Sequence, residues 1–343
     1  MNAHLLVPDL FWPAAAGGEP YRGLALPALE TLLGRGRHVR TAGTSLERWL
    51  AAAFALPPQL PLAPYALLAD GGEPGEHWWM QADPVHLKVH RDRLILADAT
   101  RLGITSNEAA DLVAALNAQL APDGITFVAP TPSRWYARLA GDPRVLTTPT
   151  AEVIGRNVEP FMPSGDEGSR WRRIANEAQI LLHAHAHNEA RENGGALTIN
   201  SVWFWGAGRV GKPVTPYDDV ASNHPLARGL ALAARSAVSP LPASAASLLK
   251  APGGKTPLIV AELSAASAYG DITGWRDAVT GLERSWWAPI VAGLQDGVLE
   301  SITLHALGPD FACAATLNRK DLRRFWRRRR PLLDFAGFGL KRG

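Results

Sequence analysis

Short apolar runs bounded by turn residues alternate along the chain with longer segments whose apolar residues recur every three to four positions. The first pattern is typical of buried strands and the second of amphipathic helices. Strands are predicted at residues 5–7, 199–204, 258–262, 299–305 and 312–317. Helices are predicted at residues 24–33, 46–56, 169–193, 223–234 and 274–294, the last with a kink at Pro289. This alternation predicts an α/β fold, in which a mainly parallel sheet is covered by helices.

The pattern changes in the middle of the chain. Strand-like runs occupy residues 78–80, 85–89, 94–97, 125–129 and 135–139, with a turn at Arg91 and Asp92. Thr105 and Glu108 have the spacing of a capping box, which predicts a helix that ends near Leu120. Strands, one helix and further strands indicate a compact α+β unit. We therefore expect an inserted domain at residues 71–141, within a discontinuous core domain formed by residues 1–70 and 142–343.

Composition places the chain among ordinary globular proteins, with 47% hydrophobic and 20% charged residues. The single cysteine, Cys313, excludes an internal disulfide and suits a reducing compartment. The first residues lack a basic segment, and Asp9 interrupts their apolar run, so a signal peptide is not expected. No apolar stretch reaches the ~18 residues of a membrane span. These features predict a soluble, cytoplasmic protein without a membrane partner.

Positive charge is concentrated at the end of the chain. Residues 319–343 form a basic tail with ten Lys and Arg against two Asp, a net charge of +8, which leaves −5 for the rest of the chain. Its arginines include Arg323, Arg324, Arg327, Arg328, Arg329 and Arg330. Such a cluster could bind nucleic acid or acidic lipid, or form a solvated terminal helix followed by Pro331. We favour the helix, because the sequence shows no second basic patch that would extend a nucleic-acid surface.

Residues 183–209 carry the densest collection of functional groups. They are predicted to form the end of a helix, a break at residues 193–195, a strand, and a glycine turn at Gly206 and Gly208. Open α/β sheets bind ligands where a strand ends, and glycine lets backbone N–H groups approach an anion. On a helix His183 and His187 would share a face while His185 points elsewhere, so a metal site is not expected. Trp203 and Trp205 are expected in the core.

These residues carry a family resemblance. The segments 185–195 and 200–208 resemble the H-P-x-N-x-x-R-x-x-x-G…N-x-x-W-x-W-G-x-G motif of archaeal-type cofactor-independent phosphoglycerate mutases, with Ala186 in place of the proline. Weaker similarity extends to residues 27–30, 80–139 and 258–283. The chain is also similar to a group of proteobacterial regulatory proteins of the Rpf type. The resemblance implies an alkaline-phosphatase-like core with an inserted domain.

The chain departs from this family at its catalytic elements. Family members transfer a phosphoryl group through a covalent serine intermediate with two divalent metals held by Asp and His clusters. Residues 264–268 read Ser-Ala-Ala-Ser-Ala where the family has D-E-x-G-H, and the family's late D-H-S-T and H-T elements have no counterpart in residues 303–343. The G-S-D nucleophile element falls on residues 43–45, which leaves Thr44 and Ser45 as weak catalytic candidates. Only Asp9 and Asp271 remain as weak metal-ligand candidates, too few for two ions.

The departures indicate a catalytically degenerate protein, which binds a phosphorylated or carboxylate metabolite in a regulatory role and needs no cofactor. The expected anion-binding residues are Arg134, His185, Asn188, Arg191, Asn200, Gly206 and Gly208. The alternative for Arg191 and the asparagines is that they only tie the helix to the strand. Another alternative is an active mutase or phosphatase with a rebuilt Mn²⁺ or Mg²⁺ site that uses Asp9, Asp271 and the histidines. A third is a nucleic-acid-associated regulator that acts through the basic tail.

Overall fold

The computed structural model describes residues 1–91, 93–250, 256–261, 263, 266–324 and 326–336. The chain forms two compact units. The core unit consists of Met1–Leu50 and Thr215–Gly343, and the inserted unit of Ala51–Val214. The inserted unit is therefore larger than the domain expected from the sequence at residues 71–141.

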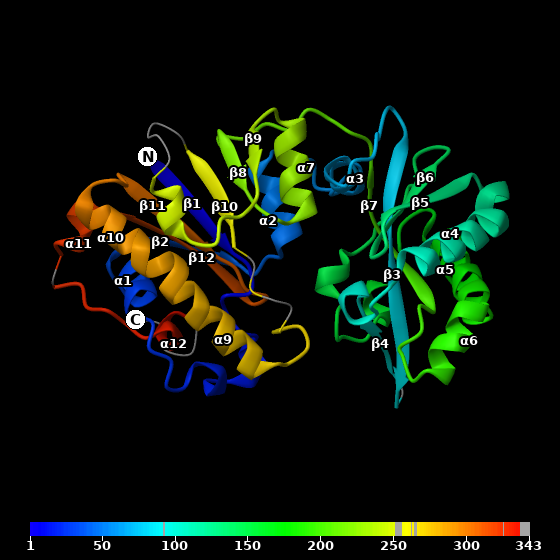
Figure 1. The fold of residues 1–343 in the computed structure, drawn as a ribbon, viewed down its shortest axis with the longest axis horizontal. Helices are drawn as coiled ribbons and strands as arrows, with labels where there is room; N and C mark the ends of the chain where they lie inside the picture. Colours follow the sequence, from blue (N-terminus) through cyan, green and yellow to red (C-terminus); the bar gives the residue numbers. More distant parts are fainter. Residues whose placement is uncertain (92, 251–255, 262, 264–265, 325, 337–343) are drawn as a thin grey trace. The chain divides into compact units, whose positions relative to one another are not determined.

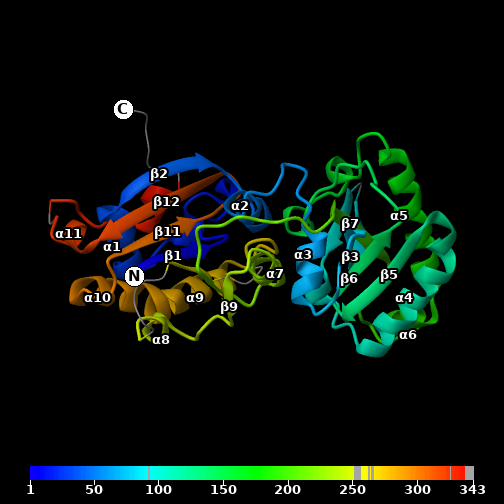
Figure 2. The same cartoon turned by 90° about the horizontal axis from the view of Figure 1, so that it is seen from above.

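A seven-stranded sheet forms the centre of the core unit, in the order β2-β12-β11-β1-β10-β8-β9 (Figures 1 and 2). The strands are β1 (Asn2–Val7), β2 (Arg37–Ala42), β8 (Asp219–Ala221), β9 (Ala237–Ser239), β10 (Pro257–Val260), β11 (Ser301–Ala306) and β12 (Phe311–Asn318). The strands from β11 to β9 are parallel, whereas β12 is antiparallel to both of its neighbours, β11 and β2. The predicted mainly parallel α/β sheet is confirmed. Glu262, which we expected at the end of β10, lies outside the described residues.

Helices α1, α9 and α10 pack on one face of this sheet around Leu5, Leu29, Trp275 and Trp287 (Figure 2). The helices of the core unit are α1 (Pro27–Arg35), α2 (Leu46–Ala53), α7 (Pro225–Ala233), α8 (Ala245–Leu248), α9 (Ile272–Leu282), α10 (Ala288–Asp296), α11 (Arg319–Leu322) and α12 (Leu332–Phe335), with 3₁₀ turns at Ala14–Ala16 and Glu19–Tyr21. A π-helical segment, Glu283–Trp287, separates α9 from α10. The expected kink therefore lies just before Pro289. The wider π-helical turn accommodates this proline, which has no N–H to donate.

An antiparallel sheet forms the inserted unit. Its strands are β3 (Trp78–His90), β4 (Arg93–Ala97), β5 (Ile125–Thr131), β6 (Arg134–Leu139) and β7 (Ser201–Gly208). Strand β7 pairs with β3, so the chain after residue 142 returns to this sheet rather than to the core unit. This pairing, which no local sequence pattern predicts, explains why the inserted unit extends to Val214.

The inserted unit also contains helices α3 (Ala63–Ala69), α4 (Ser106–Leu120), α5 (Gly168–His183) and α6 (Ala186–Asn193), and 3₁₀ turns at Ala99–Arg101, Ala121–Asp123, Thr150–Glu152 and Glu159–Phe161. Helices α4 and α5 pack on the sheet through a core that includes Trp135, Trp171 and Phe204. The predicted capping box at Thr105 is confirmed, and α4 ends at Leu120 as expected. No helix among the described residues is long and apolar enough to cross a bilayer.

Two predictions of local structure were wrong in the inserted unit. The runs predicted at residues 78–80 and 85–89 are one strand, β3, of 13 residues, in which Pro84 lies opposite Val202 of β7. The long helix predicted at residues 169–193 is two helices separated at Ala184 and His185. At the predicted turn of Arg91 and Asp92, Arg91 has a positive φ of 56°, and Asp92 lies outside the described residues.

Candidate functional site

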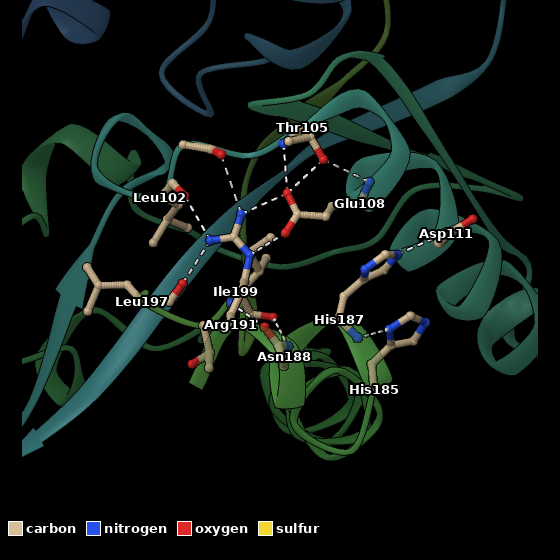
Figure 3. Close-up of polar contacts among 12 residues, drawn as sticks. Leu102, Thr105, Glu108, Asp111, His185, His187, Asn188, Arg191, Leu197 and Ile199 are labelled. Atoms are coloured by element: carbon tan, nitrogen blue, oxygen red, sulfur yellow. Dashed lines mark hydrogen bonds and ion pairs between the residues drawn. The ribbon is translucent and has the colours of Figure 1, made fainter. Parts of the chain in front are cut away.

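Arg191, the central residue of the family-like motif, lies on α6 with its guanidinium buried against the start of α4 (Figure 3). Its Nε and Nη2 donate to the two carboxylate oxygens of Glu108 at 2.6 and 2.9 Å. The Nη1 donates to the carbonyls of Leu102 and Leu197 at 2.8 and 2.9 Å, and Nη2 reaches the carbonyl of Gly103 at 3.5 Å. These bonds use all five N–H donors of the side chain. The expectation that Arg191 holds an anion is therefore not supported, because no donor is left.

Glu108 joins this ion pair to the capping box of α4. One carboxylate oxygen accepts both the backbone N–H and the hydroxyl of Thr105, each at 2.8 Å. The hydrogen bonds from Arg191 lower the pKa of Glu108 to about 2, so the carboxylate is charged at neutral pH. Thr105, Glu108, Asn188 and Arg191 are referred to below as the clasp.

Asn188 and Asn200 pair with the backbone in the manner of a peptide group. The amide of Asn188 donates to the carbonyls of Leu182 and Ile199 at 2.7 and 2.9 Å and accepts from the N–H of Ile199 at 2.7 Å. Asn200 accepts from the N–H of Leu87 at 2.8 Å and donates to its carbonyl at 3.0 Å. These bonds connect α5, α6 and β3 to the start of β7. They agree with the alternative that the two asparagines tie the helix to the strand.

The three histidines occupy different local structures. His183 ends α5, and His185 precedes α6, where its Nδ1 accepts from the N–H of His187 at 3.3 Å (Figure 3). His187 pairs through Nε2 with Asp111 at 2.7 Å. The expectation that His183 and His187 share one helical face was wrong, because the helix breaks between them. Throughout the described part of the chain, no three His, Cys, Asp or Glu side chains are grouped as metal ligands would be.

Gly206 and Gly208 lie within β7 rather than in the turn predicted after it. The carbonyl of Gly206 accepts from the N–H of Leu62 at 3.0 Å. A Cβ added to Gly208 would lie 2.1 Å from the Cβ of Pro61. Glycine is required here because the connector before α3 crosses directly over the strand. The two residues therefore accommodate the polypeptide chain where we had expected them to accommodate an anion.

Arg134, the expected anion contact from the insert, binds a carboxylate of the protein. Its Nε and Nη2 donate to both oxygens of Asp70 at 2.8 and 2.6 Å. The hydroxyl of Tyr136 donates to the same carboxylate at 2.7 Å. This bidentate pair joins β6 to the end of α3. It uses the Nε–Nη2 edge of the guanidinium, which is the edge that would bind a carboxylate or phosphate ligand in the same way.

Asp83 is a titratable group whose environment the sequence did not predict. It lies on β3 and accepts from the indole Nε1 of Trp205 at 2.7 Å, from the hydroxyl of Thr150, and from Nε2 of Gln81 at 3.4 Å. Burial raises the pKa of Asp83 to about 6, against the opposing effect of these hydrogen bonds. The alternation of the polar residues 81 and 83 along β3 is a sequence signal that points to this cluster.

In the core unit, the weak catalytic candidates lie around the loop that follows β11. The N–H of Thr44 donates to the carbonyl of Gly308 at 3.2 Å. Ser45 caps α2, because its Oγ accepts from the N–H of Arg48 at 3.4 Å. The N–H of Phe11, two residues after Asp9, donates to the carbonyl of Leu307, next to Gly308. The structure thus brings Asp9, Thr44 and Ser45 to the carboxyl edge of the sheet, where α/β enzymes place their sites.

The residues at this edge do not fit a pair of divalent metals. Asp271 caps α9, and its Oδ1 accepts from the N–H of Gly274 at 2.8 Å. Asp9 has a positive φ of 56°, and its carbonyl accepts from Nε1 of Trp275 at 2.9 Å. Two such ions need roughly six oxygen or nitrogen ligands each. The aspartate and histidine of the family element fall on Ser264, which lies outside the described residues, and on Ala268, and neither residue supplies a carboxylate or imidazole.

A second polar cluster of the core unit was missed in the sequence. Nδ1 of His4 on β1 lies 3.0 Å from Nε2 of His305 on β11. Trp49 and Tyr217 pack against the pair, with ring centroids 4.8 Å from His305 and 5.1 Å from His4. Burial lowers the pKa of both imidazoles, that of His305 to about 3. Both imidazoles are therefore neutral at pH 7. One donates a hydrogen bond to the other, and the aromatic rings of Trp49 and Tyr217 hold the pair in place.

A groove of about 440 Å³ lies beside β7 in the inserted unit. Apolar side chains that include Leu87, Met162 and Phe204 line one part of it. Arg172, Asn176 and Gln179 of α5 line the other part, and their i, i+4, i+7 spacing places them along one side of the helix. Arg172 is exposed and donates to the hydroxyl of Ser169 at 3.2 Å. The groove therefore combines an apolar surface with an exposed cation, a combination suited to a small organic anion.

Comparisons with known proteins connect the fold to one group of enzymes. No family model matches the chain. It is 30% identical over 120 residues to the 2,3-bisphosphoglycerate-independent phosphoglycerate mutase of Methanosarcina barkeri, a match that covers 34% of this chain and 30% of the relative. It is 25% identical over 129 residues to a probable enzyme of the same name from Geobacter sulfurreducens, over 36% of this chain and 32% of the relative. The chain thus matches about a third of the length of these relatives.

Two solved structures have a similar fold over most of the chain. The cofactor-independent phosphoglycerate mutase of Thermoplasma acidophilum superposes with a TM-score of 0.50 at 15% identity, over 99% of this chain and 95% of that protein. The PH0037 protein of Pyrococcus horikoshii superposes with a TM-score of 0.55 at 14% identity, over 92% of this chain and 87% of that protein. The chain therefore has the fold of a cofactor-independent phosphoglycerate mutase and is similar to such enzymes in sequence over about a third of its length.

Proposed function

We propose that this chain is a phosphoglycerate-mutase-like protein that has lost metal-dependent phosphoryl transfer and binds an anionic metabolite in a regulatory role. The observation that carries the proposal is the donor chemistry at the expected metal positions. Residues 264–268 are small and neutral, and the carboxylate of Asp271 is a helix cap. Without two cations the charge that develops on a transferring phosphoryl group loses several kcal/mol of stabilisation, which corresponds to orders of magnitude in rate.

The residues that resemble the family motif support the same proposal. Asn188, Arg191 and Asn200 are bonded to the inserted unit itself. A selection for stability is enough to retain such residues after the chemistry is lost, because a buried ion pair that loses one partner destabilises the fold. We base the regulatory role on the resemblance of the sequence to regulatory proteins of the Rpf type.

We place the anionic ligand in the groove beside β7, in place of the site expected around Arg191. A carboxylate or phosphate would pair with Arg172 and accept from the amides of Asn176 and Gln179. The apolar part of the metabolite would contact Met162 and Phe204. A small amphipathic acid therefore fits this groove better than a phosphoglycerate, which carries both a carboxylate and a phosphate.

The loss of catalysis is tested with the purified protein. We expect no conversion of 3-phosphoglycerate to 2-phosphoglycerate with added Mn²⁺ or Mg²⁺, and no stoichiometric divalent metal by elemental analysis. Turnover that disappears in Asp9→Ala would instead support the alternative, an active mutase or phosphatase with a rebuilt metal site.

The ligand site is tested by thermal shift with a panel of carboxylic and phosphorylated acids. We expect at least one acid to raise the Tm of the wild type, and Arg172→Ala to abolish that shift. Arg170→Ala is the matched control, because Arg170 lies on the same helix but donates to the carbonyl of Asp123 outside the groove. If Arg172→Ala and Arg170→Ala lose the Tm shift equally, or if no acid raises the Tm of the wild type, the assignment of the ligand to this groove is contradicted.

A further inference from the structure

Two basic segments that lie far apart in the sequence meet in the core unit. Strand β2 is an edge strand whose residues are all exposed, and it carries Arg37, His38 and Arg40 (Figure 2). The second segment is residues 326–330, which follow α11 and are not helical. The terminal helix expected from the sequence is therefore limited to the four residues of α11 before this segment. Repulsion among four successive arginines explains why a helix is disfavoured there.

Defined contacts hold the second segment beside the end of α1. Nη1 of Arg327 donates to the carbonyls of Arg35 and Gly36 at 3.3 and 3.2 Å, and these residues lie 292 and 291 positions earlier in the chain. Arg35 in turn donates to the carbonyl of Leu322. A Cβ on Gly34 would lie 2.7 Å from the carbonyl oxygen of Arg328, so this glycine allows the two backbones to approach closely. The side chain of Arg327 and the backbone at Arg328 therefore anchor the segment, while Trp326 and residues 328–330 remain exposed.

A groove of about 770 Å³ lies between these two segments, lined by Arg37, His38, Trp326, Phe335 and the arginines 327–330. A smaller cavity of about 150 Å³ shares His38 and Arg330 with it and continues to Arg40. Of the described residues that line either space, Asp334 is the one acid. We refer to the two spaces together as the basic groove.

The positive charge of the basic groove is not neutralised within the described structure. Arg37, Arg328, Arg329 and Arg330 have no ion-pair partner among the described acids. The pKa of His38 is lowered first by burial and further by nearby arginines, as expected where like charges are close together. Six guanidinium groups and one carboxylate line the basic groove, so an anionic ligand would relieve repulsion along its whole length.

We infer that the basic groove binds single-stranded nucleic acid. Arg37 on one wall and the arginines 328–330 on the other would contact phosphates, and β2 supplies the second basic patch that the sequence did not show. Trp326 has 67% of its surface exposed and lines the same groove, so its indole can stack on a base. A cationic groove with an exposed aromatic ring is the arrangement by which proteins bind single strands without sequence preference. A concave site suits a flexible chain better than a flat membrane surface.

The inference is tested by fluorescence anisotropy with a labelled oligo(dT) of about 16 nucleotides, at salt concentrations from about 50 to 200 mM. We expect log K to fall linearly with log salt, and each lost phosphate contact to reduce the slope by about 0.7. Arg37→Gln should reduce the slope by about one such step, and Arg328→Gln with Arg329→Gln by about two. Trp326→Ala should weaken binding by about 5- to 150-fold.

The control variant combines Arg156→Gln with Arg170→Gln, which removes two exposed charges of the inserted unit that line neither groove and should leave the affinity unchanged. An equal loss in the control would show that only net charge matters and would overturn the inference. Full affinity in Arg37→Gln would do so as well, because the basic tail would then act without β2. Binding to phosphatidylserine vesicles without binding to oligo(dT), or tighter binding to duplex than to single strand, would also contradict it.

Discussion

Replacement of Arg191 by alanine tests whether the clasp is structural. In the folded protein the guanidinium is 8% exposed and donates five hydrogen bonds. Arg191→Ala removes these donors and leaves the carboxylate of Glu108, whose side chain is 15% exposed, without its cation. Three backbone carbonyls lose a donor at the same time. We therefore expect a large loss of stability rather than a change confined to ligand binding.

The size of the loss follows from two independent estimates. Removal of one partner from a buried ion pair typically costs about 3–5 kcal/mol. The pKa of Glu108 is lowered from 4.5 to about 2, mainly by Arg191, which corresponds to at most about 3 kcal/mol of stabilisation at neutral pH. Both values are a large fraction of the stability of a typical domain. Arg191→Ala should thus lower the free energy of unfolding of the inserted unit by about 3 kcal/mol.

Urea denaturation monitored by far-UV circular dichroism measures this loss, and its pH dependence identifies the cause. Because the folded pKa of Glu108 is depressed, the stabilisation is complete above about pH 4.5 and is lost as the pH falls toward about 2. The difference between wild type and Arg191→Ala should therefore shrink over that window. Glu108→Gln keeps a capping-box residue but removes the charge, so it should show the same pH dependence as Arg191→Ala.

Arg173→Ala is the matched control. Arg173 also pairs with two acids, Glu177 at 2.7 Å and Asp123 at 3.4 Å, but its side chain is 54% exposed, so its removal should have little effect on stability. Arg191→Lys should not restore the wild type, since an ammonium group lacks the planar fork that reaches Glu108 and three carbonyls. If Arg191→Ala unfolds at the same urea concentration as the wild type at pH 7, the structural role of the clasp is refuted.

Two further predictions concern the inserted unit. Gly208→Ala should destabilise it by about 1–3 kcal/mol, measured as a lower Tm, because the new Cβ overlaps Pro61, whereas Gly141→Ala, with no atom within 4 Å of the added Cβ, should not. Asp83→Asn should remove part of the pH dependence of the folding stability. The folded pKa of Asp83 is raised from 3.8 to about 6, so the folded state binds the extra proton and wild-type stability should fall as the pH rises through this window. An identical pH profile in Asp83→Asn would show that Asp83 does not titrate there.

The amino-acid sequence determined the features that depend on neighbouring residues. Hydrophobic periodicity was enough to predict the parallel sheet of the core unit, because a strand or helix buries one face of its own residues. The capping box of Thr105 and Glu108 was predicted because both partners lie within one helical turn. The residue types at positions 264–268 were enough to predict that the Asp and His of the family element are missing there.

The tertiary structure alone decided the roles of groups whose partners are distant in the sequence. Arg191 has the chemistry of an anion-binding residue, but Glu108, 83 positions earlier, occupies it. The sequence showed no second basic patch that could accompany the basic tail. In the folded chain β2 supplies this patch, because α1 places Arg37 beside the arginines that follow α11. A guanidinium binds whichever acceptor the fold brings within reach, and only the folded chain specifies whether that acceptor is internal or a ligand.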